Sequence, residues 1–347
     1  MKILFLGETY RADAITWMRG VEQNAGVKLQ TLEVAPSPVR WKRVANLGLF
    51  FFSIIQINRQ QWDLVLAERA TSYGFFSLFV RAKVRIVAQQ GITDAFPLEG
   101  FAVHIKRWLQ RRVYRNVDLI HAWGHVMVPA MLNSGADPSK ITVLPKGIDL
   151  NRFHGQKRKV ESPQGKVIGI VTRSLYPEYR HEDILMAMAE VRKTFPNVEV
   201  WIVGDGVLKA ALERKSQDLG LEENLKFLGR IPNDELPDLL AQSDFYLSVP
   251  ISEGVSASLF EAMASGCFPI VSELPAYKAF LKDGQNGLLV PVCDSQALAK
   301  AVLRYLADPG RYEPGVIQNR KYIEQHVDFH QNMKALYGRY LAELSNK

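Results

Sequence analysis

Two glutamates and a run of small residues make residues 243–273 the part of the chain best suited to chemistry. The segment is SDFYLSVPISEGVSASLFEAMASGCFPIVSE, and Glu253 and Glu261 stand eight positions apart in it. We expect a buried strand before Pro250 and a helix from about Ser256, because proline interrupts strands and serine favours helix starts. Backbone N–H groups at a helix start bind anions, which suits a diphosphate.

The predicted helix start offers further contacts for a phosphate. Gly254 lets the backbone approach a ligand closely, and Ser258 and Leu259 are candidate phosphate contacts. At a rise of about 1.5 Å per helical residue, the two glutamates bracket this site roughly 8–12 Å apart. Carboxylates accept hydrogen bonds from hydroxyl pairs, so one would bind a sugar and the other a ribose. The alternative is that Glu253 lies in a surface loop and Glu261 on a solvated helix face.

These residues need a scaffold, and short β-rich runs alternate with helix-length stretches along the chain. The first six expected strands are 2–6, 27–34, 63–67, 84–88, 117–121 and 141–144. The second six are 166–171, 198–203, 225–228, 244–249, 268–271 and 287–290. The sequence therefore predicts an α/β protein with two tandem doubly wound, Rossmann-like domains that face a central cleft. A polar stretch, NRFHGQKRKVESPQGK, separates them, and we place the boundary near Gly155.

Composition and missing motifs exclude several classes of protein. With 47% hydrophobic and 23% charged residues among 347, the chain has the composition of a folded protein. Its two cysteines, Cys267 and Cys293, are too few for a disulfide framework. The longest apolar stretch, Val44–Ile57, is shorter than the roughly 20 residues of a membrane-spanning helix. A dinucleotide fingerprint at Gly204 lacks its third glycine, which is replaced by Lys209, and there is no GxxxxGK[ST] motif.

The segment 243–273 resembles the signature of the family 4 retaining glycosyltransferases, through its Glu-x7-Glu spacing and the following EAMASG. Other stretches similar to this family are LPKGIDLNRF (144–153), VGDG (203–206), FLGRIP (227–232) and DGQNGLLV (283–290). The resemblance covers about residues 117–300 and implies the B-type fold of two Rossmann-like domains. It implies an acceptor-side domain over 1–155 and a donor-binding domain over 156–325. A helix over about 326–347 would pack back on the first domain.

The resemblance also implies roles for single residues of the second domain. Glu253 would contact the donor sugar near the reacting carbon, and Glu261 the nucleotide ribose. Arg173 matches an arginine that neutralises the donor diphosphate, whereas Arg180, after a lengthened loop, stands for the family's lysine. The alternative for both is a solvated loop. We expect Glu253 and Arg173 to be catalytic, and the donor site to comprise Arg173, Arg180, Gly204, Arg230, Ile231, Glu253, Gly254, Ser258, Leu259 and Glu261.

The first domain departs from the family's pattern. Gln90, in AQQGITDAF, stands where the family often has a histidine, and one extra residue precedes Asp94. Gly7 remains from an early double-glycine loop. We expect Gly7, Gln90 and Asp94 on the acceptor side, with a turn cap as the alternative for Asp94. His121 has no metal-ligand spacing to other residues and is interpreted as structural.

The positive charge of the chain lies in its first half. Residues 1–150 hold 19 Lys and Arg against 11 Asp and Glu, whereas the rest holds 24 against 25. The stretch FAVHIKRWLQRRVYR (101–115) places apolar residues at helical spacing among five cations, and RWKR (40–43) adds a second basic, aromatic patch. Such helices either bind an anionic membrane surface or pack on the sheet with charged outer faces. Nucleic-acid binding is not expected, because no recognition motif accompanies the basic residues.

Together these patterns predict a metal-independent hexosyltransferase that uses a UDP- or GDP-sugar as co-substrate and no further cofactor. No Asp-x-Asp motif occurs, so cationic side chains and helix termini would neutralise the leaving group. The expected acceptor is a glycan or lipid-linked hydroxyl in envelope, capsular or exported polysaccharide synthesis, in the cytoplasm at the inner face of the cell membrane. Two alternatives stay open: a nucleotide-sugar epimerase on the same fold, and a non-catalytic subunit that binds sugar nucleotides.

Overall fold

The computed structural model describes residues 1–35, 40–89, 102–155 and 166–347. The chain forms two compact units, of which unit 1 comprises 1–147 with 329–347 and unit 2 comprises 148–328. The division lies before the polar stretch at Gly155, because the chain already belongs to unit 2 at Ile148. The Ile148 backbone N–H donates to the Val327 carbonyl at 2.7 Å, and Phe153 is buried.

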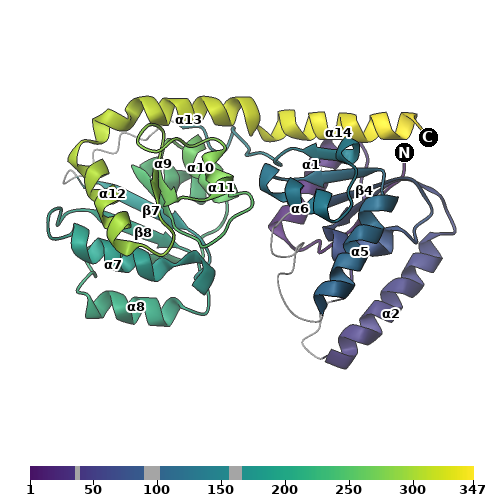
Figure 1. Cartoon of the computed structure of the whole chain (residues 1–347), viewed down its shortest axis with the longest axis horizontal. Helices are drawn as coiled ribbons and strands as arrows, with labels where there is room; N and C mark the ends of the chain where they lie inside the picture. Colours follow the sequence, from purple (N-terminus) through teal and green to yellow (C-terminus); the bar gives the residue numbers. More distant parts are fainter. Residues whose placement is uncertain (36–39, 90–101, 156–165) are drawn as a thin grey trace. The chain divides into compact units, whose positions relative to one another are not determined.

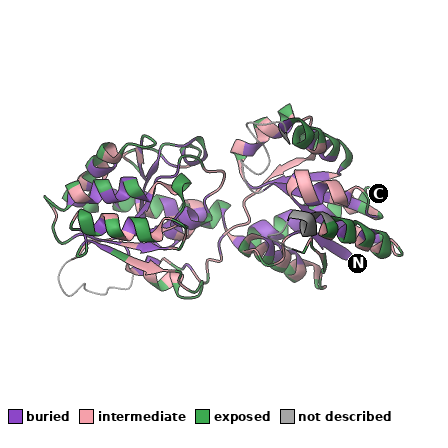
Figure 2. Ribbon diagram, turned by 90° about the horizontal axis from the view of Figure 1, so that it is seen from below, coloured by how far each residue is buried: buried purple, intermediate pink, exposed green. Residues whose placement is uncertain are grey.

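Unit 1 is built on a six-stranded parallel sheet in the order β2-β1-β3-β4-β5-β6. Its strands are β1 (Ile3–Leu6), β2 (Gln30–Leu32), β3 (Trp62–Glu68), β4 (Ala82–Gln89), β5 (Leu119–Ala122) and β6 (Ile141–Val143). The central strands are almost wholly buried, as Figure 2 shows, because helices cover both faces of a parallel sheet.

The helices of unit 1 include one from the far end of the chain. They are α1 (Ala12–Ala25), α2 (Arg40–Ile57), α3 (Gly74–Ser77), α5 (Ala102–Asn116), α6 (Val128–Asn133) and α14 (Phe329–Ser345), with a π-helical turn η1 (Arg69–Tyr73) and two 3-10 turns, η2 (His125–Met127) and η3 (Pro138–Lys140). Helix α14 lies against α1 (Figure 1). The Trp17 indole donates to the Tyr340 hydroxyl at 3.1 Å, and Gly20 leaves room for Met333. The last helix therefore completes the core of unit 1.

Unit 2 repeats the parallel architecture, with strand order β12-β11-β10-β7-β8-β9. Its strands are β7 (Ile168–Thr172), β8 (Glu199–Val203), β9 (Leu225–Gly229), β10 (Phe245–Ser248), β11 (Phe268–Ser272) and β12 (Leu288–Val290). Each of the twelve expected strands is present. The predicted fold class, two Rossmann-like α/β domains, is confirmed.

Helices cover both faces of the second sheet (Figure 1). They are α7 (His181–Val191), α8 (Lys209–Asp218), α9 (Leu236–Gln242), α10 (Ala257–Ala264), α11 (Pro275–Lys278), α12 (Ser295–Ala307) and α13 (Glu313–His326), with the 3-10 turns η4 (Pro177–Tyr179) and η5 (Pro309–Tyr312). Helix α7 packs with α8 and α12, whereas α10 packs with α9 and α13.

Aromatic side chains hold the centre of the second sheet in place. The Phe268 ring stacks on Tyr305 with centroids 5.3 Å apart and lies 4.5 Å from the Tyr312 ring. On β7, Gly169 leaves space for Phe245, whose ring atoms would lie 2.4 Å from a Cβ at that position. Burying each of these rings stabilises the fold by about 1.5–3 kcal/mol, which fixes β7 and β10 and hence the loops that follow them.

Candidate functional site

Two loops that are distant in sequence meet at the carboxyl edge of the second sheet. Strands β7 and β10 are hydrogen-bonded neighbours, with Tyr246 in register with Ile170. Because the strands are parallel, the loops that follow them leave the sheet at the same edge. Arg173 begins the first loop and Glu253 lies in the second. The Arg173 guanidinium donates to the Glu253 carboxylate, which forms an ion pair between the two predicted catalytic residues.

The ion pair lies at the start of α10. The same Arg173 nitrogen donates to the Ser256 hydroxyl, whose oxygen also accepts from the Leu259 backbone N–H at 3.3 Å and so caps α10. The guanidinium carbon lies 5.3 Å from the centroid of the Tyr179 ring. Arg173 Nε is buried and has no hydrogen-bond partner. A cation and a helix N-terminus therefore lie together, and the Nε–H of the cation is unused.

Burial sets the electrostatics of this pair. The side chains of Arg173 and Glu253 are only 15% and 14% exposed. Burial raises the pKa of Glu253 by more than the Arg173 charge and hydrogen bonds lower it. Burial by itself lowers the pKa of Arg173, but interactions with Tyr246 and Glu253 raise it, so the guanidinium keeps its charge. The Glu253 carboxylate therefore has fewer polar partners than an ion in water and would be stabilised by ligand hydroxyls.

The other predicted residues of this segment surround the helix start. Gly254 donates its backbone N–H to Glu253 at 3.2 Å. The Ser258 hydroxyl accepts from the Tyr246 hydroxyl at 3.0 Å, so its side chain is already engaged within the protein. Leu259 is fully buried, and its predicted ligand contact could come only from its backbone. Glu261 is partly buried in α10, farther along the helix than Ser256.

The loop after β8 packs directly on the loop that carries Arg173. Gly204 has φ 152°, and a Cβ there would lie 2.0 Å from the Arg173 carbonyl oxygen. A Cβ on Gly206 would lie 2.4 Å from the Leu175 carbonyl oxygen. The Leu175 backbone N–H also donates to the Asp205 carbonyl at 3.0 Å. The VGDG stretch therefore positions the backbone of the Arg173 loop, and only glycine fits at the first of these positions.

Of the remaining predicted donor residues, Arg180 lies at the far end of the loop that Arg173 begins, and Arg230 and Ile231 follow β9. Arg180 donates from Nε to Asp183 Oδ2 and from one terminal nitrogen, Nη2, to Asp183 Oδ1, at 2.8 Å each. Arg180 has φ 53° and occupies the N-cap position of α7 without a side-chain capping hydrogen bond, and its charge is paired with Asp183 in the first turn of that helix. Arg230 is exposed and Ile231 is partly exposed after β9, which β7 and β8 separate from β10.

Comparisons with known proteins identify the family of this chain. A family model described as "Glycosyl transferase 4-like domain" matches residues 4–147, and one described as "Glycosyl transferases group 1" matches residues 153–325. The chain belongs to the family 4 glycosyltransferases. The resemblance seen in the EAMASG segment is thereby confirmed.

Curated relatives of this glycosyltransferase chain include transferases of mannose and of glucose. It is 34% identical to a phosphatidyl-myo-inositol mannosyltransferase of Mycobacterium tuberculosis over 46% of this chain and 42% of that one. It is 29% identical to a 2-deoxystreptamine glucosyltransferase of Streptomyces kanamyceticus over 60% of this chain and 50% of that one. The chain spans about half the length of the curated relatives it matches.

Solved structures share the fold over the whole chain. The Anabaena protein HepE in complex with UDP-glucose superposes with a TM-score of 0.79 at 17% identity and covers 99% of both chains. Sucrose-phosphate synthase from Thermosynechococcus elongatus gives a TM-score of 0.82 at 15% identity and covers 100% of both chains. At this identity the likeness establishes the two-domain fold of the glycosyltransferase.

On the predicted acceptor side, only Gly7 lies in the described part of the chain; Gln90 and Asp94 lie outside it. A Cβ on Gly7 would lie 2.6 Å from a Phe5 ring atom and 2.7 Å from Glu68 Oε2. Glu68 is fully buried and accepts from the Glu8 backbone N–H at 2.8 Å. Gly7 therefore makes room for a buried carboxylate of the same unit.

Sequence reasoning missed His181, which follows Arg180 and is almost fully buried. Its ring lies 6.5 Å from the Tyr179 ring, and neither ring nitrogen has a hydrogen-bond partner. Burial and the nearby Arg173 charge lower the pKa of His181 to about 4, so the ring is neutral at pH 7. The signal in the sequence is a histidine directly after Arg180, in the run YRHED.

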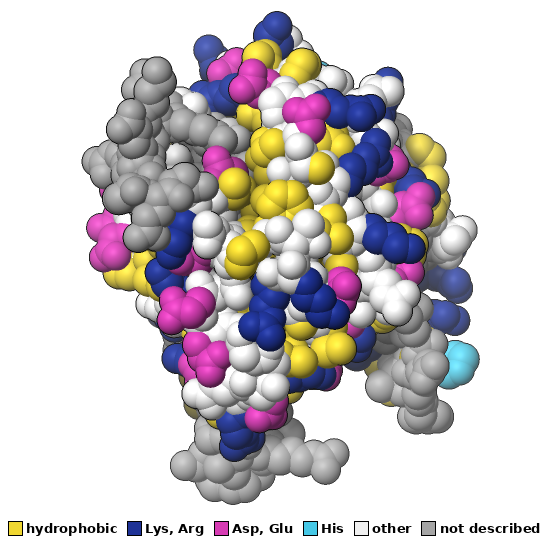
Figure 3. All heavy atoms as spheres, turned by 90° about the vertical axis from the view of Figure 1, so that its left-hand side faces the viewer, with side chains coloured by type: hydrophobic (Ala, Val, Ile, Leu, Met, Phe, Trp, Pro, Cys, Tyr) yellow, Lys and Arg dark blue, Asp and Glu magenta, His cyan; other side chains and the backbone are white. Residues whose placement is uncertain are grey.

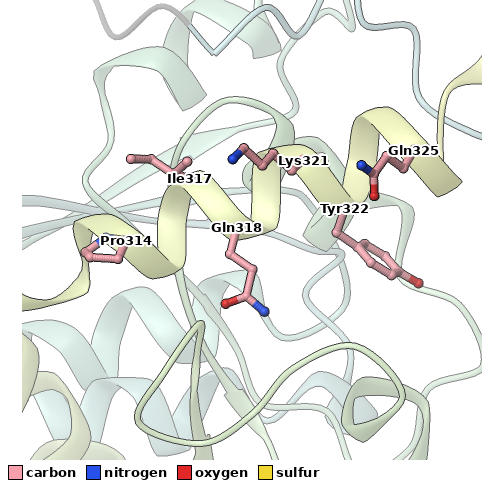
Figure 4. Close-up of a pocket in the computed structure, with 6 residues that line it drawn as sticks. All are labelled: Pro314, Ile317, Gln318, Lys321, Tyr322 and Gln325. Carbon is pink, nitrogen blue, oxygen red and sulfur yellow. The ribbon is translucent and has the colours of Figure 1, made fainter.

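Other candidate sites are weaker in the described ranges. No three His, Cys, Asp or Glu side chains there are grouped so that they could hold a metal ion. A hollow of about 400 Å³ lies along α13 and is lined by Pro314, Ile317, Gln318, Lys321, Tyr322 and Gln325 (Figure 4). All six come from one helix, and none is a predicted site residue.

Proposed function

We propose that this chain is a retaining glycosyltransferase that moves a hexose-type sugar from a nucleoside-diphosphate sugar to an acceptor hydroxyl. The observation that carries the proposal is the cluster of Arg173, Glu253 and Ser256 at the start of α10. It combines a cation and a helix N-terminus, which suit a diphosphate, with a buried carboxylate, which suits sugar hydroxyls. The names of the mannosyltransferase and glucosyltransferase relatives support the same class of reaction.

The unused donor of Arg173 indicates how the diphosphate would bind. A guanidinium has five N–H donors, and here one terminal nitrogen already serves Glu253 and Ser256. The buried Nε, which has no partner, would donate to a phosphate oxygen when the donor binds. Arg173 would then bridge the diphosphate and Glu253, so the sugar and the leaving group are held by one connected set of hydrogen bonds.

The reaction is a substitution at the anomeric carbon. Its bond to the diphosphate oxygen breaks, the acceptor oxygen bonds to the same carbon, and the acceptor proton passes to the departing phosphate. Arg173 and the α10 N-terminus stabilise the negative charge that develops on the leaving group. Glu253 orients the sugar through its hydroxyls. We propose attack from the face of the leaving group, without a covalent glycosyl-enzyme intermediate and without a metal ion.

The finer assignments belong to the same proposal. The donor is a UDP- or GDP-sugar, with Arg180, Gly204, Arg230, Ile231, Gly254, Ser258, Leu259 and Glu261 completing its site. Gly7, Gln90 and Asp94 belong to the acceptor side. The acceptor is a glycan or a lipid-linked hydroxyl in cell-envelope or exported polysaccharide synthesis, used in the cytoplasm at the membrane's inner face. The phosphatidylinositol acceptors named for the mycobacterial relatives support a lipid acceptor.

Donor binding is tested by thermal unfolding with UDP-, GDP-, ADP- and dTDP-sugars in the presence of EDTA. A ligand that binds only the folded protein raises the melting temperature, so one nucleotide series is expected to do so. The rise should disappear in Arg173→Met and persist in Lys193→Met, which removes a cation from an exposed ion pair with Glu190. A donor shift that requires a divalent metal would contradict metal independence, and no shift with any donor would contradict the binding site.

Catalysis is tested with Glu253→Gln and a panel of lipid-linked and soluble sugar acceptors. We expect donor binding to be kept, release of the nucleoside diphosphate to fall at least about 100-fold, and the wild-type product to keep the donor's anomeric configuration. Conversion of the donor sugar without an acceptor would indicate the epimerase alternative. Donor binding with no turnover on any acceptor would indicate the non-catalytic subunit.

A further inference from the structure

Helices α2 and α5 of unit 1 expose an apolar surface that the donor site does not use. On α2, Leu49, Phe52 and Ile55 are 65%, 58% and 55% exposed; on α5, Ile105 and Trp108 are 55% and 58% exposed. We name as the apolar face the exposed side chains Leu47, Leu49, Phe51, Phe52, Ile55, Phe79, Ile105 and Trp108. Isolated exposed apolar residues are ordinary, but a group of this size on neighbouring elements marks an interaction surface.

Aromatic contacts join the two helices into one surface. The Phe51 ring lies 5.5 Å from the Phe79 ring, and Phe79 lies 5.3 Å from Phe75. Phe75 in turn lies 6.2 Å from Trp108, so the rings run from α2 to α5, which Figure 1 shows in the same part of unit 1. The edge-to-face geometry of the first two contacts holds the rings in defined positions.

Helix α2 is apolar on two sides, and only one of them is needed for folding. Phe50 and Ile54 point inward and are almost fully buried, and the Phe50 ring contacts Tyr73 and Phe76. The opposite side carries Leu49 and Phe52 outward. Burying one side is enough to hold a helix on a domain. The outward side therefore needs an explanation other than the stability of unit 1.

The charged residues of α2 and α5 have a single sign. Helices α2 and α5 together contain eight Lys and Arg and no Asp or Glu. On α5 the cations Lys106, Arg107, Arg111, Arg112 and Arg115 are all exposed. By contrast, the face of unit 2 in Figure 3 carries Lys, Arg, Asp and Glu side chains intermixed. A second copy of this face would meet like charge, which disfavours self-association and favours an anionic partner.

We propose that the apolar face of α2 and α5 inserts into the headgroup region of a membrane rich in anionic phospholipid. The apolar side chains would enter the boundary with the acyl chains, and the α5 cations would bind lipid phosphates. None of the described helices is long and apolar enough to cross a bilayer, so the chain would lie on the membrane. The proposal deepens the proposed function, because a lipid-linked acceptor is met at such a surface.

The test is sedimentation of the full chain with vesicles of phosphatidylcholine alone or of equal parts phosphatidylcholine and phosphatidylglycerol. We expect binding to the anionic vesicles only. The triple variant Leu49→Ser, Phe52→Ser, Ile55→Ser should lower the partition coefficient at least about tenfold, because each exposed apolar anchor is lost. Replacing Lys106, Arg107 and Arg111 with Gln should lower the partition coefficient about fivefold per cation. High salt should make this difference smaller, because it screens the attraction between the cations and the lipid phosphates.

Matched controls are available on unit 2. Val207→Ser with Ile317→Ser removes two comparably exposed apolar side chains, and Lys193→Gln with Lys278→Gln removes two exposed cations. Neither control should change vesicle binding. Equal binding to neutral vesicles, undiminished binding by the triple variant, or an equal loss in the controls would overturn the proposal. A wild-type dimer that the triple variant converts to monomers would overturn it in favour of self-association.

The membrane proposal and the proposed function can be contradicted independently of each other. The triple variant is also tested for its melting temperature and for the donor-induced rise in that temperature, both of which should match the wild type because α2 points these side chains to solvent. If the chain binds vesicles but no donor raises its melting temperature, the membrane proposal stands and the transferase proposal is contradicted. A donor shift without vesicle binding would do the reverse.

Discussion

Both sheets place a glutamate–arginine ion pair at their carboxyl edge, and the two pairs are shielded to a similar degree. In unit 1, Glu8 pairs with Arg69 at 2.7 Å, with side chains 24% and 18% exposed. In unit 2, Glu253 pairs with Arg173 at 14% and 15% exposure. The pairs nevertheless differ in the groups around them, and that difference separates a structural ion pair from a candidate binding site.

Glu8 is fully satisfied within unit 1. Burial raises its pKa, but hydrogen bonds and charges from Arg69 and Arg11 outweigh this and lower the pKa below its usual value. Within the part of the chain that the structure describes, Arg173 is the one cation that lowers the pKa of Glu253, and there burial prevails and raises that pKa.

Unit 1 also has buried polar atoms without partners, such as Ser72 Oγ, but in unit 2 such atoms include a nitrogen of the ion pair itself, Arg173 Nε, and both ring nitrogens of His181. Buried polar atoms without partners are costly to the fold, so their presence beside a buried charge indicates a place for a ligand.

The largest expected difference is in activity. Arg173→Met should lower kcat/KM for sugar transfer by about 100–1000-fold, since a charge that stabilises the leaving group is removed. Arg69→Met should lower it less than about tenfold, because Arg69 neutralises Glu8 rather than the diphosphate. Nucleoside-diphosphate release with saturating acceptor measures both variants. An equal loss in the two would mean that the pair in unit 1 also belongs to the site.

Replacing the glycine beside each ion pair with alanine should destabilise the protein to different extents. Gly204→Ala brings a Cβ against the backbone carbonyl of Arg173 at 2.0 Å, so the main chain must move. Gly7→Ala meets the side chains of Phe5 and Glu68, which can shift. We expect a loss of about 3 kcal/mol or more for the first and about 1–3 kcal/mol for the second in urea unfolding. The reverse order would show that the Arg173 loop is adaptable.

The twelve strands could be predicted from the sequence, because buried parallel strands are short apolar runs whose ends are marked by neighbouring polar residues, glycine or proline. The same holds for the start of α10, where Ser256 acts as a helix cap in both the expectation and the structure. The proximity of Arg173 to Glu253 required the strand order, which local patterns do not contain. The family resemblance, and no local pattern, implies that both residues bind the same donor.

Side-chain partners were beyond sequence reasoning for a physical reason. Arg180 follows Glu178 and precedes Glu182 and Asp183, and the backbone at Arg180 is left-handed while its guanidinium binds Asp183. His181 lies in a polar run, YRHED, yet tertiary packing buries it. In α2 the apolar residues occupy every side of the helix, so periodicity alone could not distinguish the buried Phe50 from the exposed Phe52.

Each unit has a buried histidine that should make its stability depend on pH, and the two histidines differ in their hydrogen bonds. In unit 1, His121 Nε2–H donates to the Leu144 carbonyl at 2.7 Å, and His121 Nδ1 accepts from the Trp123 indole at 3.2 Å. In unit 2, His181 has neither bond. Burial lowers the pKa of both to about 4, with smaller contributions from the Leu144 hydrogen bond and Lys146 charge for His121, and from Arg173 for His181.

In the unfolded chain a histidine takes up its proton at about pH 6.5, whereas in the folded chain each of these two does so at about pH 4. As the pH falls over this range, each histidine therefore lowers the free energy of unfolding by about 3 kcal/mol. Urea unfolding at pH 7 and pH 5 separates their roles. His181→Leu should remove part of the acid loss and cost little at pH 7. His121→Leu should cost about 1–3 kcal/mol at pH 7, because it leaves buried partners unpaired. A large loss at pH 7 in His181→Leu would show that this ring has structural partners.

The smallest expected effect distinguishes two helix caps within unit 2. Ser256 caps α10 and also binds Arg173, whereas Asp294 caps α12 by accepting from the Ala297 backbone N–H at 2.8 Å. Either residue replaced by Ala should lose about 1 kcal/mol of stability, since each helix loses one cap. Only Ser256→Ala also releases a hydrogen bond that orients the guanidinium, which should weaken donor binding about three- to tenfold. Calorimetric titration of the donor into both variants measures this difference. Equal donor affinity in the two would show that Glu253 and Tyr179 suffice to orient Arg173, and would restrict the role of Ser256 to the helix.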